Sequence, residues 1–205
     1  LFGSVEQVVT TKELIDKKTL ANLKIKCITL KHPEKREKMT YAEELDYIVS
    51  HEKRNTFLCD LLHHLNGNTL CLFQLVEKHG KVLYERMKGK ENVYFVYGAT
   101  SAEQREEIRT IVDKSKNSTT IASYGTFSTG INIRNINNIV LASPSKSKIR
   151  VLQSIGRGLR TSSSKDSILV FDIADDISYK GRYNFTLNHF FERLNIYNEE
   201  QFNYE

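Results

Sequence analysis

The sequence predicts an α/β fold with a parallel sheet of about six strands. Short apolar runs alternate with amphipathic stretches along most of the chain, and this alternation is typical of βαβ units. The chain has 205 residues and a hydrophobic content of 40%, which is enough to bury a full core. No apolar run reaches the roughly 20 residues that a membrane-spanning helix needs.

Six apolar runs are expected to form the strands. They are Lys24–Leu30, Thr69–Phe73, Val93–Tyr97, Thr119–Ser123, Asn138–Ala142 and Ile168–Ile173. Tyr94 and Tyr97 belong to one of these runs, so we interpret them as core or edge residues of the sheet. Pro33 and Pro144, which are the only prolines, both fall in predicted loops just after strands.

Helical patterns separate the strands. Residues 41–65 are expected to form one or two helices, and further helices are expected over 75–87, 101–113, about 147–159 and about 182–197. The third of these ranges opens on Ser101, with Gln104 three residues later, which is the sequence of a capping box.

Cysteines and histidines give no sign of a metal site. The three cysteines, Cys27, Cys59 and Cys71, are odd in number and lack a CxxC spacing, so neither a disulfide framework nor a zinc site is expected. His51, His63, His64 and His79 have no metal-ligand spacing and are expected on helix surfaces. Without a signal-peptide pattern, the composition fits a reducing, cytoplasmic setting.

Positive charge is concentrated in one part of the chain. The 51 residues from Ser115 to Lys165 contain no Asp or Glu but carry eight cations, whereas the whole chain has a net charge of only +5. The other 154 residues therefore carry 5 − 8 = −3. A local positive field of this kind is what a polyanion or a nucleotide phosphate requires.

Within this window, residues 153–160 have the pattern of a phosphate-sensing helix. Gln153, Arg157 and Arg160 stand at i, i+4 and i+7 and therefore share one helical face. An unpaired guanidinium cluster repels itself unless an anion binds. The alternative is a solvated basic helix face.

Ligands of open parallel sheets bind at the carboxyl ends of the strands. After the fourth predicted strand, residues 124–133 carry glycines and hydroxyl side chains that can donate to phosphate oxygens. A plain turn is the alternative for this segment.

The sequence lacks the parts of a complete nucleotide hydrolase. No GxxxxGK[ST] P-loop is present. Asp172, Asp175 and Asp176 lie at the end of the last predicted strand and just after it, but without a P-loop we interpret them as a helix start or a surface turn. The chain is therefore expected to be at most half of such an enzyme.

The order of four segments resembles the second RecA-like domain of a superfamily 2 helicase. These segments are Phe73-Gln74, residues 98–105, residues 123–133 and residues 153–160, which correspond to motifs IV, IVa, V and VI. Residues 1–5, 9–11, 122–130 and 202–204 are similar to the UvsW-type branched-DNA helicases of T-even-like phages. The resemblance implies a RecA-like three-layer domain.

The resemblance also implies a domain organisation and an activity. Residues 1–22 would connect to an N-terminal RecA-like domain that is missing here, 23–177 would form the C-terminal helicase domain, and 178–205 a helical extension. The whole protein would be an ATP-dependent DNA helicase that remodels branched DNA or R-loop intermediates in recombination, repair and replication. The isolated chain would be inactive, because ATP and Mg²⁺ would be held mainly by the missing domain.

For the nucleotide, the resemblance assigns Arg157 and Arg160 to the γ-phosphate, with Arg160 as the arginine finger, and Gln153 to the phosphate or the attacking water. Gly130 and Asn132 would lie near the nucleotide. For the nucleic acid, which would be branched or single-stranded DNA or an RNA–DNA hybrid, it assigns Gln74, Gly98, Thr100, Ser123, Tyr124 and Thr126. Lys146, Lys148 and Arg150 could add phosphate contacts or could simply be solvated.

Two alternatives stay open at this point. One is a binding module that grips the nucleic-acid backbone and hydrolyses nothing. The other is a translocase or restriction motor subunit of the same superfamily. A pure binder has no need to hold two arginines and a glutamine on one helical face, which favours the helicase.

Overall fold

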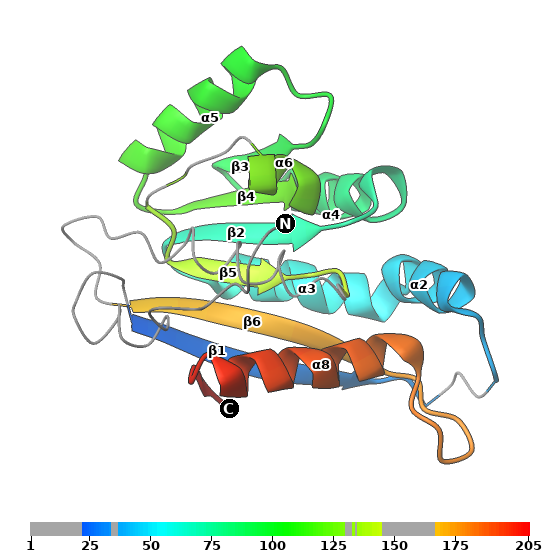
Figure 1. Ribbon diagram of the computed structural model, residues 1–205. Helices are drawn as coiled ribbons and strands as arrows, with labels where there is room; N and C mark the ends of the chain where they lie inside the picture. Colours follow the sequence, from blue (N-terminus) through cyan, green and yellow to red (C-terminus); the bar gives the residue numbers. More distant parts are fainter. Residues whose placement is uncertain (1–21, 34–36, 130–132, 134, 145–166) are drawn as a thin grey trace, which may run out of the picture.

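The computed structural model describes residues 22–33, 37–129, 133, 135–144 and 167–205, and it confirms the predicted α/β fold (Figure 1). In this part of the chain, a seven-stranded sheet has the order β3-β4-β2-β5-β6-β1-β7, and all neighbouring strands are parallel. The strands are β1 (Asn22–Lys31), β2 (Asn68–Phe73), β3 (Val93–Val96), β4 (Ser118–Ser123), β5 (Asn138–Leu141), β6 (Ser167–Asp176) and β7 (Asn203–Tyr204).

The strand that the sequence did not predict is β7. It has only two residues, which is too short for a hydrophobic period to be detected. It pairs with β1 at the edge of the sheet, where Asn203 lies opposite Lys24. The amide of Glu205 then donates to the carbonyl of Ile25 at 3.1 Å, so the C-terminal residues extend the same edge.

The helices agree with most of the predicted ranges. They are α2 (Tyr41–Ser50), α3 (Glu52–His64), the π-helical turn η1 (Val76–Gly80), α4 (Lys81–Met87), α5 (Ala102–Lys114), α6 (Tyr124–Thr129) and α8 (Phe185–Glu199). The capping box is confirmed: Ser101 Oγ accepts from the Gln104 amide at 3.2 Å, and Gln104 Oε1 accepts from the Ser101 amide at 3.2 Å. The helix expected over 147–159 lies outside the described residues.

Two local details differ from the sequence prediction. The helix expected over 75–87 begins with the π-helical turn η1, where Gly80 lies against the Phe73 ring. A Cβ at Gly80 would come within 2.4 Å of that ring, so glycine allows this close approach. Residues 124–129, for which the sequence suggested a phosphate-binding segment or a plain turn, form the short helix α6.

Helices cover both faces of the sheet. Helices α3 and α4 lie on one face, and α5 and α8 lie on the other (Figure 1). Successive strand residues point to opposite faces, so Phe73 packs with Leu58 of α3, whereas Leu72 belongs to the cluster that contains Val112 of α5 and Tyr197 of α8. This three-layer arrangement leaves the carboxyl ends of the strands at one edge, on the right in Figure 1.

The three cysteines are free thiols. Among the helices of the described residues, none is long and apolar enough to cross a membrane. The boundaries at residues 22 and 177 remain predictions.

Candidate functional site

The carboxyl ends of β2, β4 and β5 meet at one edge because the strands are parallel and in register. Phe73 at the end of β2 lies opposite Ser123 of β4, and Leu72 lies opposite Leu141 of β5. The sheet therefore brings the residues after these strands together, namely Gln74, Tyr124 and Ser143, although they are far apart in the sequence.

Gln74 is an exposed residue whose backbone is held from inside the protein. Its amide donates at 3.1 Å to Oγ of Ser143, which follows the end of β5. The backbone of Gln74 is thus fixed while its side chain faces solvent. A fixed protein backbone with an exposed side chain is the geometry needed to contact a phosphate or sugar of a nucleic acid.

The segment with Gly98 and Thr100 forms a tight turn after β3. The Thr100 amide donates to the Tyr97 carbonyl at 3.0 Å, and Thr100 Oγ1 accepts from the Tyr97 amide at 3.0 Å. The carbonyl of exposed Gly98 accepts from Arg105 of α5 at 3.0 Å. The Thr100 hydroxyl is therefore used within the turn, whereas the backbone around Gly98 is accessible.

Ser123, Tyr124 and Thr126 are buried. Ser123 Oγ lies 2.7 Å from Thr126 Oγ1 and accepts from the Thr126 amide at 3.3 Å, so it caps the start of α6. The Tyr124 hydroxyl donates to the Ser143 carbonyl at 3.1 Å. These three side chains position the start of α6, and a ligand would meet the backbone of this segment.

Ser143 also connects this edge to a buried histidine. His79 is fully buried on η1, and its Nδ1 lies 2.9 Å from Ser143 Oγ. Its Nε2 lies 3.5 Å from Arg54 Nη1. Because a guanidinium has only donors, Nε2 must accept, and Nδ1–H then donates to Ser143. His79 is therefore neutral, and burial together with Arg54 lowers its pKa to about 3.

Arg54 lies at the centre of the same network. It is buried on α3, and its Nε donates to both oxygens of Asp175 at 2.8 and 3.0 Å. Its Nη2 donates to the carbonyl of Ala142 at 2.7 Å, next to Ser143. One guanidinium thus joins α3 to the ends of β5 and β6.

Asp175 completes the network at the end of β6. His32, which follows β1, lies with Nε2 2.9 Å from Asp175 Oδ1. Burial alone would raise the pKa of this carboxyl, but the Arg54 charge and the His32 hydrogen bond outweigh it and hold the pKa below its usual range. We call Arg54, His79, Ser143, Asp175 and His32 the edge network.

The expectation for the three aspartates was wrong for two of them. Asp175 is buried in the edge network, and Asp172 is fully buried in β6. Asp172 accepts two bonds of 2.8 Å from Arg193 and one of 2.8 Å from the Tyr197 hydroxyl, both on α8. Both carboxylates can be buried in the sheet because each forms an ion pair with a buried arginine. Asp176, which is half-buried, accepts from the Ser178 amide at 3.0 Å and therefore starts a turn.

The expectation for the histidines was wrong for His79, which is buried rather than on a helix surface. His51 is half-buried as the N-cap of α3, where it accepts from the Arg54 amide at 3.2 Å. His63 and His64 are exposed, as predicted. Tyr94 and Tyr97 are half-buried against the two cores, in agreement with their interpretation as core or edge residues.

Several predicted site residues lie outside the described residues. They are Gly130, Asn132, Lys146, Lys148, Arg150, Gln153, Arg157 and Arg160. Their roles remain predictions. Within the described ranges, no group of three or more His, Cys, Asp or Glu residues could hold a metal ion.

Sequence reasoning missed Arg54, Ser143 and the buried roles of His79 and Asp175. A signal for Arg54 was present, because Arg54, Leu58 and Leu62 repeat at i, i+4 and i+8 and place a cation on the apolar face of a helix. Such a cation needs a buried partner. The partner, Asp175, could not be found from the sequence, since it lies 121 positions away.

Comparison with known proteins identifies the family. The model of the helicase conserved C-terminal domain matches residues 53–162, which is more than half of the chain. The chain belongs to the helicase C-terminal domain family. The matched range includes the ends of β2, β4 and β5 and three members of the edge network, Arg54, His79 and Ser143.

The relatives are consistent with this family. The chain is 35% identical, over its whole length, to the ATP-dependent DNA helicase UvsW of Enterobacteria phage T4, of which it spans 44%. The crystal structure of T4 UvsW superposes with a TM-score of 0.78 at 36% identity, covering 91% of this chain and 41% of the phage protein. The C-terminal domain of the DEAD-box protein Dbp5 shares the fold, with a TM-score of 0.56 at 14% identity, covering 91% and 89% of the two chains.

Proposed function

We propose that this chain is the C-terminal motor half of an ATP-dependent DNA helicase that remodels branched DNA or R-loop intermediates. The proposal is supported by membership of the helicase C-terminal domain family and by the similarity to UvsW over the whole chain. Because the chain spans less than half of UvsW, the activity would belong to a longer protein. We expect that protein to act in the cytoplasm, of a bacterium or of a phage-infected host.

The observation that carries the proposal is the fixed backbone at the carboxyl edge of the sheet. Gln74 is exposed, yet its amide is held by Ser143, and Gly98, which follows β3 two strands away, is exposed on the same edge. Backbone groups and small polar side chains suit contacts to sugar and phosphate, which carry no base sequence. Binding at this edge would therefore be largely independent of sequence and weakened by salt.

The residues proposed for the nucleotide are Gln153, Arg157 and Arg160, with Gly130 and Asn132. In this proposal Arg160 neutralises charge that develops on the γ-phosphate, and Arg157 supports it. In other phosphoryl-transfer enzymes an arginine finger contributes roughly 10³ to 10⁵ in rate. ATP and Mg²⁺ would be held mainly by the other RecA-like domain, and the acid-free window from Ser115 to Lys165 would supply the positive field.

Translocation would follow from opening and closing of the cleft between the two domains as ATP binds and leaves. The edge network would keep the ends of β2, β5 and β6 together during this movement, because Ser143 and Arg54 link all three. The C-terminal domain would then move as a rigid body along the nucleic-acid strand.

The test is ATP hydrolysis by the full-length protein, with and without forked DNA. Hydrolysis stimulated by DNA is expected for the wild type, and its loss is expected for Arg157→Ala and Arg160→Ala with DNA binding kept within a few-fold. Arg86→Ala is a matched control, because Arg86 forms a surface ion pair with Glu52. Turnover that survives in both arginine variants would contradict the motor role and favour a binding module.

The isolated chain provides a second check. We expect it to hydrolyse no ATP and to bind DNA weakly, with an affinity that falls as salt is added. DNA binding that is indifferent to salt would contradict the role of the basic window.

A further inference from the structure

Exposed aromatic side chains gather at one place on the surface. The described residues include five exposed large hydrophobic side chains, and one of them, Ile111, lies apart on α5. The other four are Tyr41, Tyr183, Phe185 and Phe191, which are 36, 63, 48 and 37% exposed. Tyr41 and Phe185 have ring centroids 6.2 Å apart, and those of Tyr183 and Phe191 are 5.1 Å apart. We call these four residues the aromatic patch.

A short hairpin between β6 and α8 presents part of this patch. Tyr179 and Arg182 pair through two backbone hydrogen bonds of 3.1 and 3.0 Å, and Lys180 and Gly181 form the turn between them. Both turn residues have a positive φ, 48° and 75°, as in the tight turns of β-hairpins. The turn places Lys180 at the exposed tip, with Nζ 5.1 Å from the centre of the Tyr179 ring.

The patch borders a pocket of about 530 Å³ between the hairpin and the segment that precedes α2. Lys38, Lys180 and Arg182 line this pocket, together with the carboxylates of Glu37 and Glu44. Glu44 is only 1% exposed, and it accepts hydrogen bonds from the amides of Phe185 and Thr186 at the start of α8. The exposed charges of the pocket are therefore three cations and one carboxylate, that of Glu37. This balance of charge favours a negatively charged ligand.

The sequence of this region has the same character. From Ile177 to Phe191, fifteen residues contain no Asp or Glu, and they hold five of the twenty Tyr and Phe residues of the chain. Two tyrosines flank two basic residues in Tyr179-Lys180-Gly181-Arg182-Tyr183. Aromatic faces beside cations are the usual means of binding unpaired nucleic-acid bases and their phosphates.

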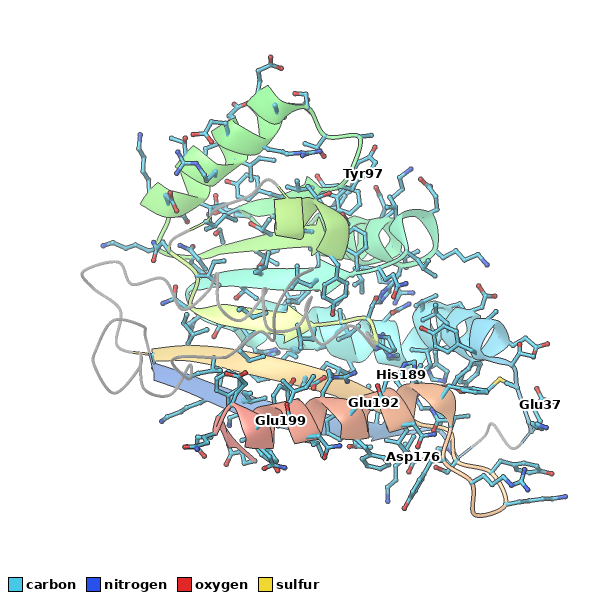
Figure 2. All side chains as sticks on the ribbon, viewed as in Figure 1. Glu37, Tyr97, Asp176, His189, Glu192 and Glu199 are labelled. Carbon is cyan, nitrogen blue, oxygen red and sulfur yellow. The ribbon has the colours of Figure 1, made fainter. Side chains whose placement is uncertain are left out.

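The patch lies on the same edge of the sheet as Gln74. The hairpin follows the end of β6, and β5 is the one strand between β6 and β2. Leu72 of β2 lies level with Asp172 of β6, roughly 10 Å away across β5, and β6 then continues for four residues to Asp176, from which the hairpin starts. Figure 2 shows Glu37, beside the pocket, and Tyr97, beside Gly98, at opposite ends of this edge. A nucleic-acid strand that contacts Gln74 and runs along the carboxyl ends of the β-strands would reach the aromatic patch.

We propose that the aromatic patch is a binding site for single-stranded nucleic acid. A base stacks on Tyr183 or Phe185, and Lys180, Arg182 and Lys38 contact the adjacent phosphates. Stacking requires an unpaired base, so the site takes a separated strand rather than a duplex. The inference rests on the proposed function, since it extends the strand path of the motor, but it has its own readout.

The first test is binding of a dye-labelled oligothymidylate of about 12 nucleotides to the full-length protein, followed by fluorescence anisotropy. Loss of one stacked base corresponds to about 1–3 kcal/mol, and for a ring that is 63% exposed we expect the lower end, a loss of about five- to tenfold in affinity for Tyr183→Ala. Tyr183→Phe should bind as the wild type does, whereas Tyr183→Leu should resemble Tyr183→Ala because it lacks an aromatic face. Ile111→Ala is the control for loss of an exposed apolar side chain elsewhere.

The phosphate contacts have a separate signature. Removing two cations with Lys180→Ala and Arg182→Ala should lower the slope of log affinity against log salt by roughly 1.4 for a single strand. The same loss of two positive charges at the other end of the strands, with Lys24→Ala and Lys114→Ala, should leave this slope unchanged. Tyr183→Ala should reduce affinity without changing this slope.

Photocrosslinking identifies the contact directly. An oligothymidylate in which one base is replaced by 5-iodouracil should crosslink to Tyr183 or Phe185. A crosslink elsewhere, together with Tyr183→Ala binding within twofold of the wild type, would overturn the proposal, as expected if a protein surface covers the patch. If DNA-stimulated hydrolysis is present but the patch variants bind normally, only this inference fails. If hydrolysis is absent but the crosslink forms, the site stands and the motor function fails.

Discussion

Replacing Arg54 with methionine should destabilise the domain far more than the same change at the surface. The Arg54 and Asp175 side chains are both 0% exposed, and the guanidinium donates twice to the carboxylate and once to the carbonyl of Ala142. Arg54→Met keeps most of the length of the side chain but leaves the Asp175 charge buried with only His32 beside it. Breaking a buried pair in this way costs about 3–5 kcal/mol.

The free energy of unfolding, measured by urea denaturation of the chain, is the assay. Arg109→Met on α5 is the matched control, because Arg109 pairs with Glu106 and Asp113 but its side chain is 31% exposed. Arginine and methionine have similar helix propensities, so this control should cost about 1 kcal/mol or less. For a chain of this size, a loss of 3–5 kcal/mol corresponds to a fall in Tm of about 6–20 °C.

The double variant Arg54→Met, Asp175→Leu tests the cause. Removing the stranded carboxylate should restore part of the stability lost in Arg54→Met, because no uncompensated buried charge remains. If Arg54→Met costs no more than Arg109→Met, or if the double variant is less stable than the single one by the full cost of Asp175→Leu, the buried pair does not hold the edge together.

Two further predictions concern the other buried polar groups. The His79 pKa is lowered to about 3 by burial and by Arg54, so the unfolded chain takes up a proton below its usual value of 6.5 that the folded chain does not. Stability from this group is therefore complete above about pH 6.5 and falls as the pH drops toward 3, by about 1.4 kcal/mol per pH unit. Urea denaturation between pH 7 and 5 should show a shallower dependence for His79→Gln than for wild type or for the exposed control His63→Gln, and equal slopes would contradict a buried neutral histidine. Tyr197→Phe removes the hydroxyl that donates to buried Asp172 at 2.8 Å, and it should cost about 1.5–3 kcal/mol. The control is Tyr204→Phe, because the Tyr204 hydroxyl donates to Asn198 on the surface, and in the same urea denaturation assay its cost should stay within about 0.5 kcal/mol; equal losses would argue against the Asp172 cluster as a clamp for α8.

The sheet could be predicted because its strands are buried on both faces. Residues 68–73 and 118–123 are buried at every position, so each strand reads as a continuous segment between helical patterns. The capping box at Ser101 was equally local, and it is present as predicted. The two-residue strand β7 carries no such local signal, because it depends on its contact with β1.

The sequence did not predict the aromatic patch, because the predicted start of the last helix was wrong. A helix was expected from about Arg182, which assigned Tyr183 to its first turn. The helix α8 begins at Phe185, and the residues before it form the hairpin with Lys180 and Gly181 at its tip. A lysine in a left-handed turn has no pattern that distinguishes it from a lysine in a helix, so only the structure reveals the exposed ring.

Ser143 shows why the edge of the sheet acts as a unit. Its hydroxyl holds the Gln74 amide and the buried His79, whereas its carbonyl accepts from the Tyr124 hydroxyl. The segments after β2 and β4 are therefore tied to β5 through different atoms of one residue, and loss of one tie leaves the other in place. Because Arg54 binds the adjacent carbonyl of Ala142 and also Asp175, the restraint extends to the end of β6, where the hairpin of the aromatic patch begins. A displacement at Gln74 could reach the hairpin only by breaking buried hydrogen bonds, so we expect the two proposed strand contacts to keep a fixed separation while the domain moves.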